Sequence, residues 1–298
     1  MTRSADGDLL VGMEQMLAVN GIELCTETFG SPSDPPILLI GGKSASMDYW
    51  EDDFCEALAA GGRYVIRYDH RDTGRSTTWP AGAPGYTWRD MVADVPGILD
   101  ALGLDRAHLF GISMGGAVAE CAAVLYPERV ITLILDQTTS AFEGVELPPI
   151  GEAMAEFFAA AADRPMPDVD DHDALVTMLV EDQRAFIPRR FDEQRMRAVC
   201  ERSVRRTPDL RPSFENHDAA PEGERIEASL ADITAPTLVI HGTADPLMPV
   251  GHGEVLAREI PDATLLTLED VGHEPPPPYT WETAIPAILD HTSPTDAT

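Results

Sequence analysis

The chain alternates between short apolar runs and segments whose apolar residues recur every three or four positions. Short apolar runs are typical of buried strands, and the longer period is typical of helices that cover a sheet. The first two strands form a predicted hairpin. Apolar and polar side chains alternate over residues 14–30 around Asn20-Gly21, a strong two-residue turn signal.

Further predicted strands cover residues 37–40, 63–69, 107–110, 129–136, 236–242 and 263–268. Predicted helices cover residues 48–60, 87–104, 114–127, 251–260 and 279–291. Strands that alternate with helices favour right-handed crossovers and a mostly parallel sheet covered on both faces. The pattern therefore predicts an α/β fold with a mostly parallel eight-stranded sheet.

Residues 137–232 break this alternation. Helix-like pieces, such as 152–162 and 172–187, are separated by polar stretches that contain proline, and no convincing strand is present. One helix is enough for a crossover between parallel strands, so this segment is predicted to be a helical cap inserted after the sixth strand. The predicted α/β core then comprises residues 1–136 and 233–298.

One serine stands at the end of an apolar strand, in Gly111-Ile112-Ser113-Met114-Gly115. This spacing is typical of a strained strand-to-helix turn that lifts a serine oxygen into a cleft. In parallel sheets, ligand sites form at the carboxyl ends of the strands, where Ser113 lies. Ser113 is therefore the candidate nucleophile.

A serine nucleophile needs a base to take its proton. His273 is the candidate, because it lies in a loop after the last strand, next to Gly272 and a run of prolines. An ordinary surface histidine is the alternative interpretation. Of the other histidines, His108 opens a strand at the wrong end of the sheet. His70 has arginine neighbours typical of a structural role, and His241 ends a strand where a packing role is expected.

The base in turn needs an acid that holds its tautomer and stabilises its charged form. Asp245 follows the strand 236–242 and is the candidate, although it could equally form a turn before Pro246. Asp136 competes with it, because it too ends a strand at the carboxyl edge.

Acyl transfer also needs hydrogen-bond donors aimed at the developing oxyanion. Met114 follows the candidate nucleophile at a helix start, where its backbone N–H is free. The loop after strand 37–40 contains Gly42, which is the expected source of the second backbone donor.

The order Ser113, Asp245, His273 and four sequence segments resemble the α/β-hydrolase superfamily, specifically its capped serine esterases. The segments are RYDHRDTGRS, LDALGLDRAHLFGISMGG, APTLVIHGTADPLMP and VGHE. The glycine pair before Lys43, together with RYDHRDTGRS, is most similar to the bacterial methylesterases of anthracyclines, the aclacinomycin type included. That resemblance implies an α/β-hydrolase fold and hydrolysis of a methyl ester on a bulky aromatic polyketide, with Ser113, Asp245 and His273 as the triad.

The chain departs from the wider superfamily at Ile40, where a histidine often precedes the oxyanion glycine. This exchange removes a hydrogen bond that fixes the loop and leaves the backbone donor in place. Lys43 is the only lysine, and its expected environment is solvent, with contact to an acidic substrate as the alternative. Trp50 is a candidate for the pocket wall.

Apolar residues of the cap, Met154, Phe157, Phe158 and Phe186, stand at helical spacing and are interpreted as cap core. An ester hydrolase that forms an acyl-enzyme is the predicted function. A carbon–carbon bond hydrolase and a perhydrolase-like enzyme use the same triad, so both functions remain as alternative interpretations. A ligand-binding protein that retains the fold without catalysis is the alternative from another class.

Composition narrows the expected partners. The formal net charge of −30 argues against nucleic acid and anionic membranes. No apolar run approaches the ~18 residues of a membrane span, and acidic residues interrupt the N-terminal segment where a signal peptide would be apolar. The four cysteines are scattered without paired spacing, so we expect them to be reduced thiols. Because reduced thiols are typical of the cytoplasm, a cytoplasmic protein is predicted. No cofactor or metal motif is present in the sequence, and a monomer or a homodimer is expected.

Overall fold

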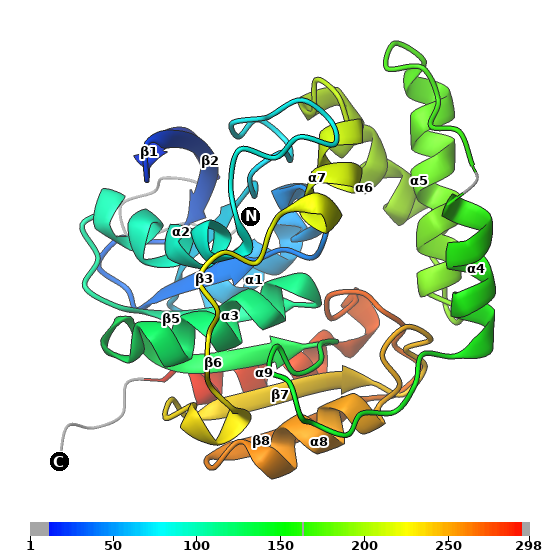
Figure 1. Cartoon of the computed structure of the whole chain (residues 1–298). Coiled ribbons are helices and arrows are strands. Elements are labelled where there is room, and N and C mark those ends of the chain that lie inside the picture. The colour runs from blue at the N-terminus through cyan, green and yellow to red at the C-terminus, as the bar shows by residue number, and fades with distance from the viewer. Residues whose placement is uncertain (1–11, 163, 294–298) are drawn as a thin grey trace, which may run out of the picture.

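The computed structural model describes residues 12–162 and 164–293, and their strands form one eight-stranded sheet (Figure 1). The strands are β1 (Met13–Val19), β2 (Ile22–Phe29), β3 (Pro36–Ile40), β4 (Tyr64–Tyr68), β5 (Ala107–Ile112), β6 (Val130–Asp136), β7 (Thr237–Gly242) and β8 (Ala263–Leu268). The spatial order is β1-β2-β4-β3-β5-β6-β7-β8. The β1–β2 and β2–β4 pairs are antiparallel and all other pairs are parallel, which confirms the predicted sheet.

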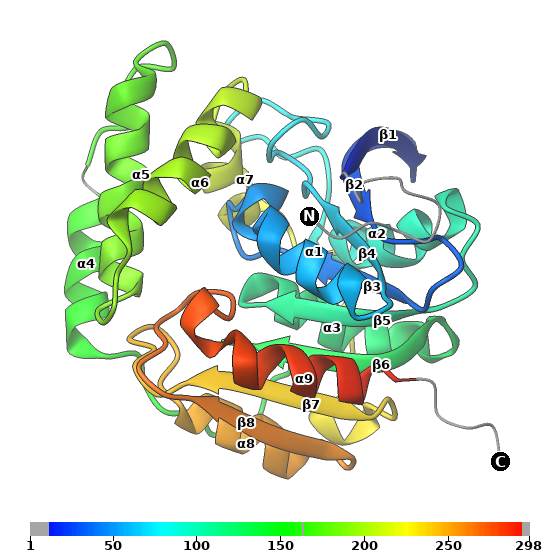
Figure 2. The ribbon, with the colours of Figure 1, turned by 180° about the vertical axis from the view of Figure 1, so that it is seen from behind.

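Helices cover both faces of the sheet because the central strands are apolar on both sides. They are α1 (Asp52–Ala60), α2 (Trp88–Ala101), α3 (Met114–Leu125), α8 (Gly251–Glu259) and α9 (Trp281–His291). Leu38, Ile66 and Leu109 belong to the core cluster shared with α2, α3 and α8. Their strand neighbours Ile37 and Val65 belong to the cluster shared with α1 and α9. Figure 2 shows α1 and α9 together on one face.

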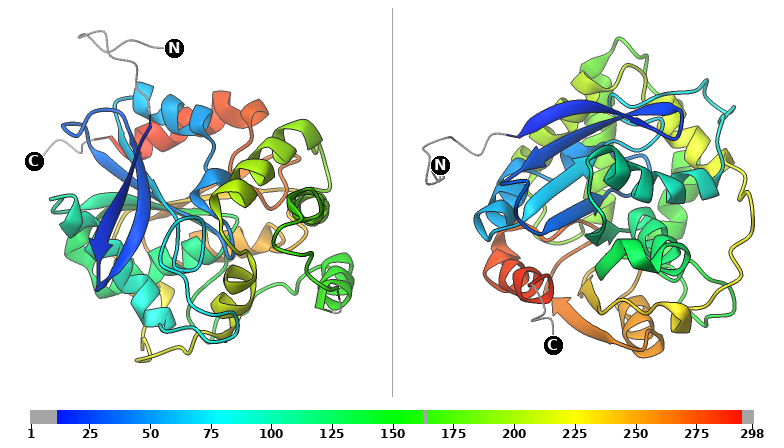
Figure 3. Two further views of the ribbon diagram at one scale, coloured as in Figure 1. Left: turned by 90° about the horizontal axis from the view of Figure 1, so that it is seen from above. Right: turned by 90° about the vertical axis from the view of Figure 1, so that its left-hand side faces the viewer.

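The chain between β6 and β7 forms the helices α4 (Glu152–Ala162), α5 (His172–Phe186), α6 (Glu193–Arg206) and α7 (Arg211–Ala219). These helices lie beside the sheet at the ends toward which its parallel strands point (Figures 1 and 3). Helices α5 and α6 share an apolar cluster of their own, which includes Leu175, Leu179 and Cys200. The cap predicted after the sixth strand is therefore present, and its boundaries at 137 and 232 stay a prediction.

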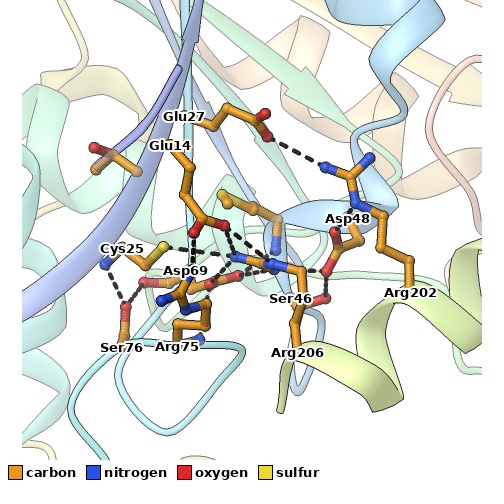
Figure 4. A network of polar contacts seen from close by, with 12 residues as sticks. Glu14, Cys25, Glu27, Ser46, Asp48, Asp69, Arg75, Ser76, Arg202 and Arg206 are labelled. Atoms are coloured by element: carbon orange, nitrogen blue, oxygen red, sulfur yellow. Dashed lines mark hydrogen bonds and ion pairs between the residues drawn. The ribbon is translucent and has the colours of Figure 1, made fainter. Parts of the chain in front are cut away.

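Arginines on α6 attach the cap to acidic side chains of the core (Figure 4). Arg206 Nη1 donates to Asp48 Oδ2 at 2.7 Å, and its Nη2 donates to Asp69 Oδ2 at 2.8 Å. Arg202 lies one turn earlier and pairs with the other oxygen of Asp48 at 2.7 Å. Both aspartates are buried. Because a buried charge is costly without a partner, this cluster fixes α6 on the core.

Most element boundaries agree with the sequence pattern to within a few residues, and the start of α1 differs most from its predicted position. Residues 48–60 were expected to be helical, whereas Met47–Tyr49 form a 3₁₀ turn and α1 begins at Asp52. Trp50 separates the two with a ψ of 87°, outside the helical region. Cys25, Cys55, Cys121 and Cys200 are free thiols, and all of them are buried. Within the described residues no helix is long and apolar enough to cross a membrane. Residues 1–11, which include most of the segment in which a signal peptide would lie, are outside the described residues.

Candidate active site

Ser113 occupies a sharp turn between β5 and α3, with φ of 54° and ψ of −122°. A positive φ is strained for a side chain with a Cβ, and such strain is concentrated at functional sites. Gly111 and Gly115 permit the turn. A Cβ at Gly111 would overlap the carbonyl of Gly115, and a Cβ at Gly115 would overlap the carbonyl of Ile40. The predicted strand-turn-helix context of Ser113 is present.

A backbone amide of the loop after β3 and one at the start of α3 both lie next to Ser113. Strands β3 and β5 are neighbours in the sheet, with Ile40 opposite Gly111, so the residues after both strands come together. A Cβ built on Gly42 would lie 3.5 Å from Ser113 Cβ. Met114 is the first residue of α3, where a backbone N–H has no partner inside the helix. In the described residues neither of these two amides donates a hydrogen bond to the protein.

Asp245 and His273 are joined by a hydrogen bond. His273 Nδ1 lies 2.8 Å from Asp245 Oδ2. Asp245 Oδ1 accepts the backbone N–H groups of Leu247 and Met248, each at 2.8 Å. Asp245 therefore forms the turn before Pro246 and contacts the histidine as well. The His273 loop is held by the cap, because its backbone N–H donates to the carbonyl of Phe186 at 2.9 Å.

Asp136 makes no hydrogen bond to His273. It is completely buried, and within the described chain neither of its carboxyl oxygens has a hydrogen-bond partner. Burial raises the pKa of Asp136 well above its ordinary value, and the charges of Asp245 and Glu274 raise it further. This environment favours the uncharged form of Asp136, whereas the acid that supports an imidazolium must be charged.

The other histidines are engaged elsewhere. His108 Nδ1 lies 2.9 Å from Thr132 Oγ1, and His241 Nε2 lies 2.7 Å from the Met248 carbonyl. His241 is 3.8 Å from Asp245, too far for a hydrogen bond. His70 Nε2 lies 3.0 Å from the carbonyl of Gly41. This contact is structural, as its arginine neighbours suggested, and it reaches the loop that holds the candidate oxyanion donor.

A pocket of about 350 Å³ opens over Ser113 and His273. Its lining comes from the loops after β3, β5, β7 and β8 and from the cap: Gly41, Gly42, Lys43, Ala45, Tyr49, Trp50, Ile112, Ser113, Met114, Phe158, Gln183, Phe186, Leu247, Met248, His273 and Pro275. The lining is mostly apolar, which is typical of small-molecule sites.

The pocket includes residues that the sequence placed elsewhere. Phe158 and Phe186 both line it, although they were interpreted as cap core. Phe158 is 38% exposed, whereas Phe186 also packs against the apolar cluster of the cap, so it serves both the core and the pocket. Trp50 also lines the pocket and is buried. Lys43 also lines it, half-exposed, and pairs with both carboxyl oxygens of Asp218 on α7 at 2.8 Å. Gln183 was not identified in advance, because one glutamine in a helix carries no distinguishing pattern.

The arrangement is suited to acyl transfer. A serine oxygen, a histidine held by a carboxylate and two free backbone N–H groups share one apolar pocket. Among residues 12–162 and 164–293, no cluster of three or more His, Cys, Asp or Glu side chains could hold a metal ion.

Comparison with known proteins agrees with this site. The family model described as alpha/beta hydrolase fold matches residues 35–276. This chain belongs to the α/β-hydrolase fold family. The chain is 32% identical over 279 residues to rhodomycin D methylesterase DauP of Streptomyces sp. (strain C5), covering 88% of this chain and 92% of that protein. It is 31% identical over 279 residues, with the same coverage, to rhodomycin D methylesterase DnrP of Streptomyces peucetius.

A solved structure confirms the fold of this α/β-hydrolase over nearly its full length. The 2-hydroxy-6-oxo-6-phenylhexa-2,4-dienoate hydrolase from Rhodococcus sp. strain RHA1 superimposes with a TM-score of 0.70, covering 95% of this chain and 99% of that one. Its sequence identity is 20%, so the likeness concerns the architecture alone.

Proposed function

We propose that this protein is a serine hydrolase that cleaves a carboxylic ester through an acyl-enzyme, with Ser113 as nucleophile. The observation that carries the proposal is the hydrogen bond between His273 Nδ1 and Asp245 Oδ2, because His273 lines the same pocket as Ser113. The ester hydrolase class agrees with the two methylesterase relatives.

The mechanism follows from the proton positions. The carboxylate of Asp245 accepts the Nδ1–H of His273, so the Nε2 atom is left unprotonated and can take the Ser113 proton. Ser113 Oγ attacks the ester carbonyl, and the N–H groups of Gly42 and Met114 bind the oxyanion. His273 then returns its proton to the alkoxide that leaves. Water, deprotonated by the same histidine, cleaves the acyl-enzyme and regenerates Ser113.

We propose a methyl ester on a bulky aromatic molecule as the substrate. The relatives DauP and DnrP are named for rhodomycin D, which supplies the class of compound to be tested. Phe158 and Phe186 from the cap, with Trp50 from the core, give the pocket apolar and aromatic walls. Such walls would stabilise a bound aromatic acyl group, both by burying its apolar surface and by packing against its rings. The proposed binding partner is thus a small-molecule substrate. We propose that the protein itself is located in the cytoplasm.

The test is product analysis on purified protein. Wild type and Ser113→Ala are incubated with rhodomycin D and with small aryl esters, and the carboxylic acid and the alcohol are quantified by mass spectrometry. We expect equimolar acid and methanol from rhodomycin D with the wild type only.

Three results would contradict the proposal. Acid formation that survives in Ser113→Ala would exclude the serine mechanism. Cleavage of a vinylogous diketone in the absence of any esterase activity would replace it with a carbon–carbon bond hydrolase. Binding without turnover of any substrate would favour the non-catalytic alternative.

A further inference from the structure

The oxyanion loop of this chain lacks the histidine that often precedes its glycine, since Ile40 stands there. Another histidine reaches the loop from a different strand. His70 follows β4, and its Nε2 lies 3.0 Å from the carbonyl oxygen of Gly41. A carbonyl oxygen can only accept, so the histidine donates this hydrogen bond.

That carbonyl belongs to the same peptide group as the Gly42 N–H. A peptide group is planar and trans, so its C=O and N–H point in opposite directions. A donor that fixes the Gly41 oxygen on one side therefore fixes the direction of the Gly42 N–H on the other side. Gly42 lies next to Ser113: a Cβ built on Gly42 would be 3.5 Å from Ser113 Cβ.

We propose that His70 is a positioning residue of the oxyanion hole, which orients the peptide between Gly41 and Gly42 toward the reaction site. The inference rests on the proposed ester hydrolysis. His70 does not touch the substrate in this account and acts only through the peptide group. Its bond also polarises that peptide, which strengthens the Gly42 N–H as a donor.

The ring of His70 is held rigidly enough for this role. It is 2% exposed, and it packs edge-on against Tyr68, with ring centroids 4.8 Å apart. The backbone carbonyl of His70 accepts from both the N–H and the hydroxyl of Thr73, at 3.1 and 2.9 Å. Burial lowers the pKa of His70 to about 3, so the ring is neutral at ordinary pH.

The neighbouring Asp69 ties the two loops to each other. Its Oδ1 accepts the Met47 N–H at 2.8 Å, on the loop after β3, and its Oδ2 accepts the Arg75 N–H at 3.0 Å, on the loop after β4. Arg206 of the cap pairs with the same carboxylate (Figure 4). The position of His70 relative to the Gly41 carbonyl is thus set by a buried charged cluster.

Cap helix α7 holds the other half of the oxyanion turn. His217 Nδ1 accepts the Ser44 N–H at 3.1 Å, and the Ser44 hydroxyl donates to the Ser213 carbonyl at 2.7 Å. The turn is closed by Ala45 N–H on the Gly42 carbonyl at 3.3 Å. Ser44 has a φ of 61°, a strained conformation that such contacts are needed to maintain. His70 therefore acts on a turn whose far end is already fixed.

The test compares His70→Phe, which keeps a ring in the cavity and removes the donor, with His70→Gln. The side-chain amide of glutamine can place an N–H near the former Nε2 position. Removal of a whole oxyanion donor typically costs ~10²–10³ in rate, so loss of its orientation should lower kcat by about 10–100-fold. KM for the ester should change by less than about threefold, and His70→Gln should recover most of kcat.

Two further measurements separate positioning from a merely structural role. Affinity for a trifluoromethyl ketone, which forms an oxyanion on Ser113, should fall in step with kcat/KM in His70→Phe. The pH profile of kcat should keep its shape, because His70 is neutral throughout. The matched control is His108→Phe, another buried histidine, bonded to Thr132 far from the site. It should lower thermal stability without changing kcat.

A labelling experiment distinguishes failure of the His70 proposal from failure of the proposed ester hydrolysis. The rate at which a fluorophosphonate labels Ser113 depends on the same oxyanion donors and requires no ester substrate. A wild type that labels quickly but hydrolyses no ester contradicts the proposed function alone. Folded His70→Phe with wild-type kcat, ketone affinity and labelling rate overturns the role of His70. A glutamine variant as slow as the phenylalanine variant overturns it as well.

Discussion

Substitution of Asp245 by asparagine distinguishes the two candidate acids. In the wild type, Asp245 Oδ1 accepts two backbone N–H groups and Oδ2 faces His273 Nδ1 at 2.8 Å. In Asp245→Asn, the new amide oxygen should stay on the two backbone donors, because the reverse orientation would place an NH₂ group against them. Each hydrogen bond lost in that flip costs about 0.5–1.5 kcal/mol.

The amide NH₂ of the introduced asparagine would then face His273. It can only donate, so His273 must accept at Nδ1 and carry its proton on Nε2, which is the wrong tautomer for deprotonating Ser113. The corresponding exchange in the triad of a serine protease lowers kcat by ~10⁴, which amounts to about 5.4 kcal/mol in activation free energy. We expect a similar loss here, with no change in secondary structure.

The assay is kcat/KM for an aryl ester, with Asp136→Asn as the matched control. Burial raises the pKa of Asp136 and so favours its protonated form, which asparagine resembles, and activity should therefore remain within a few-fold of wild type. The reasoning is refuted if Asp245→Asn retains more than about a tenth of wild-type activity. It is equally refuted if Asp136→Asn is the variant that loses activity.

Two predictions concern stability. Burial raises the pKa of Glu120 from 4.5 to about 8, so the folded state binds a proton more tightly than the unfolded state and loses stability as pH rises from about 4.5 to about 8. Glu120→Gln should remove this dependence, at most ~1.4 kcal/mol per pH unit, in urea unfolding at pH 5, 6.5 and 8; parallel curves for both proteins would contradict it. Arg206→Met leaves the buried carboxylate of Asp69 without its cap partner and should lower the free energy of unfolding by about 3–5 kcal/mol. Arg211→Met, at an exposed pair on α7, is the control and should leave the unfolding midpoint unchanged, whereas equal effects of both would refute the role of the buried cluster.

Local patterns sufficed for the features that lie next to one another in the chain. Ser113 is surrounded by the glycines its turn requires, and the alternation of strands and helices determines where the strand ends meet. His273 and Asp245 each follow a strand of that sheet, so the sheet brings them together. The start of α1 was less predictable, because Met47–Tyr49 form a separate turn with an apolar spacing that resembles a helix.

Features that depend on contacts between distant segments could not be predicted. The bond from His70 joins it to a carbonyl in another loop, and the ion pair of Lys43 joins it to the cap helix α7. Phe158 and Phe186 have the spacing of core residues, and only the position of the cap over the sheet turns them toward the pocket. The way the cap packs over the sheet therefore decides which apolar residues of a cap helix face a ligand.

The most direct test of the central claim is the intact mass of the protein after exposure to a fluorophosphonate, with wild type and Ser113→Ala in parallel. An activated serine forms a covalent adduct, whereas an ordinary surface serine does not. We predict one adduct on the wild type and none on Ser113→Ala. An unlabelled wild type, or a Ser113→Ala variant that is labelled to the same extent, would contradict the assignment of Ser113 as the nucleophile.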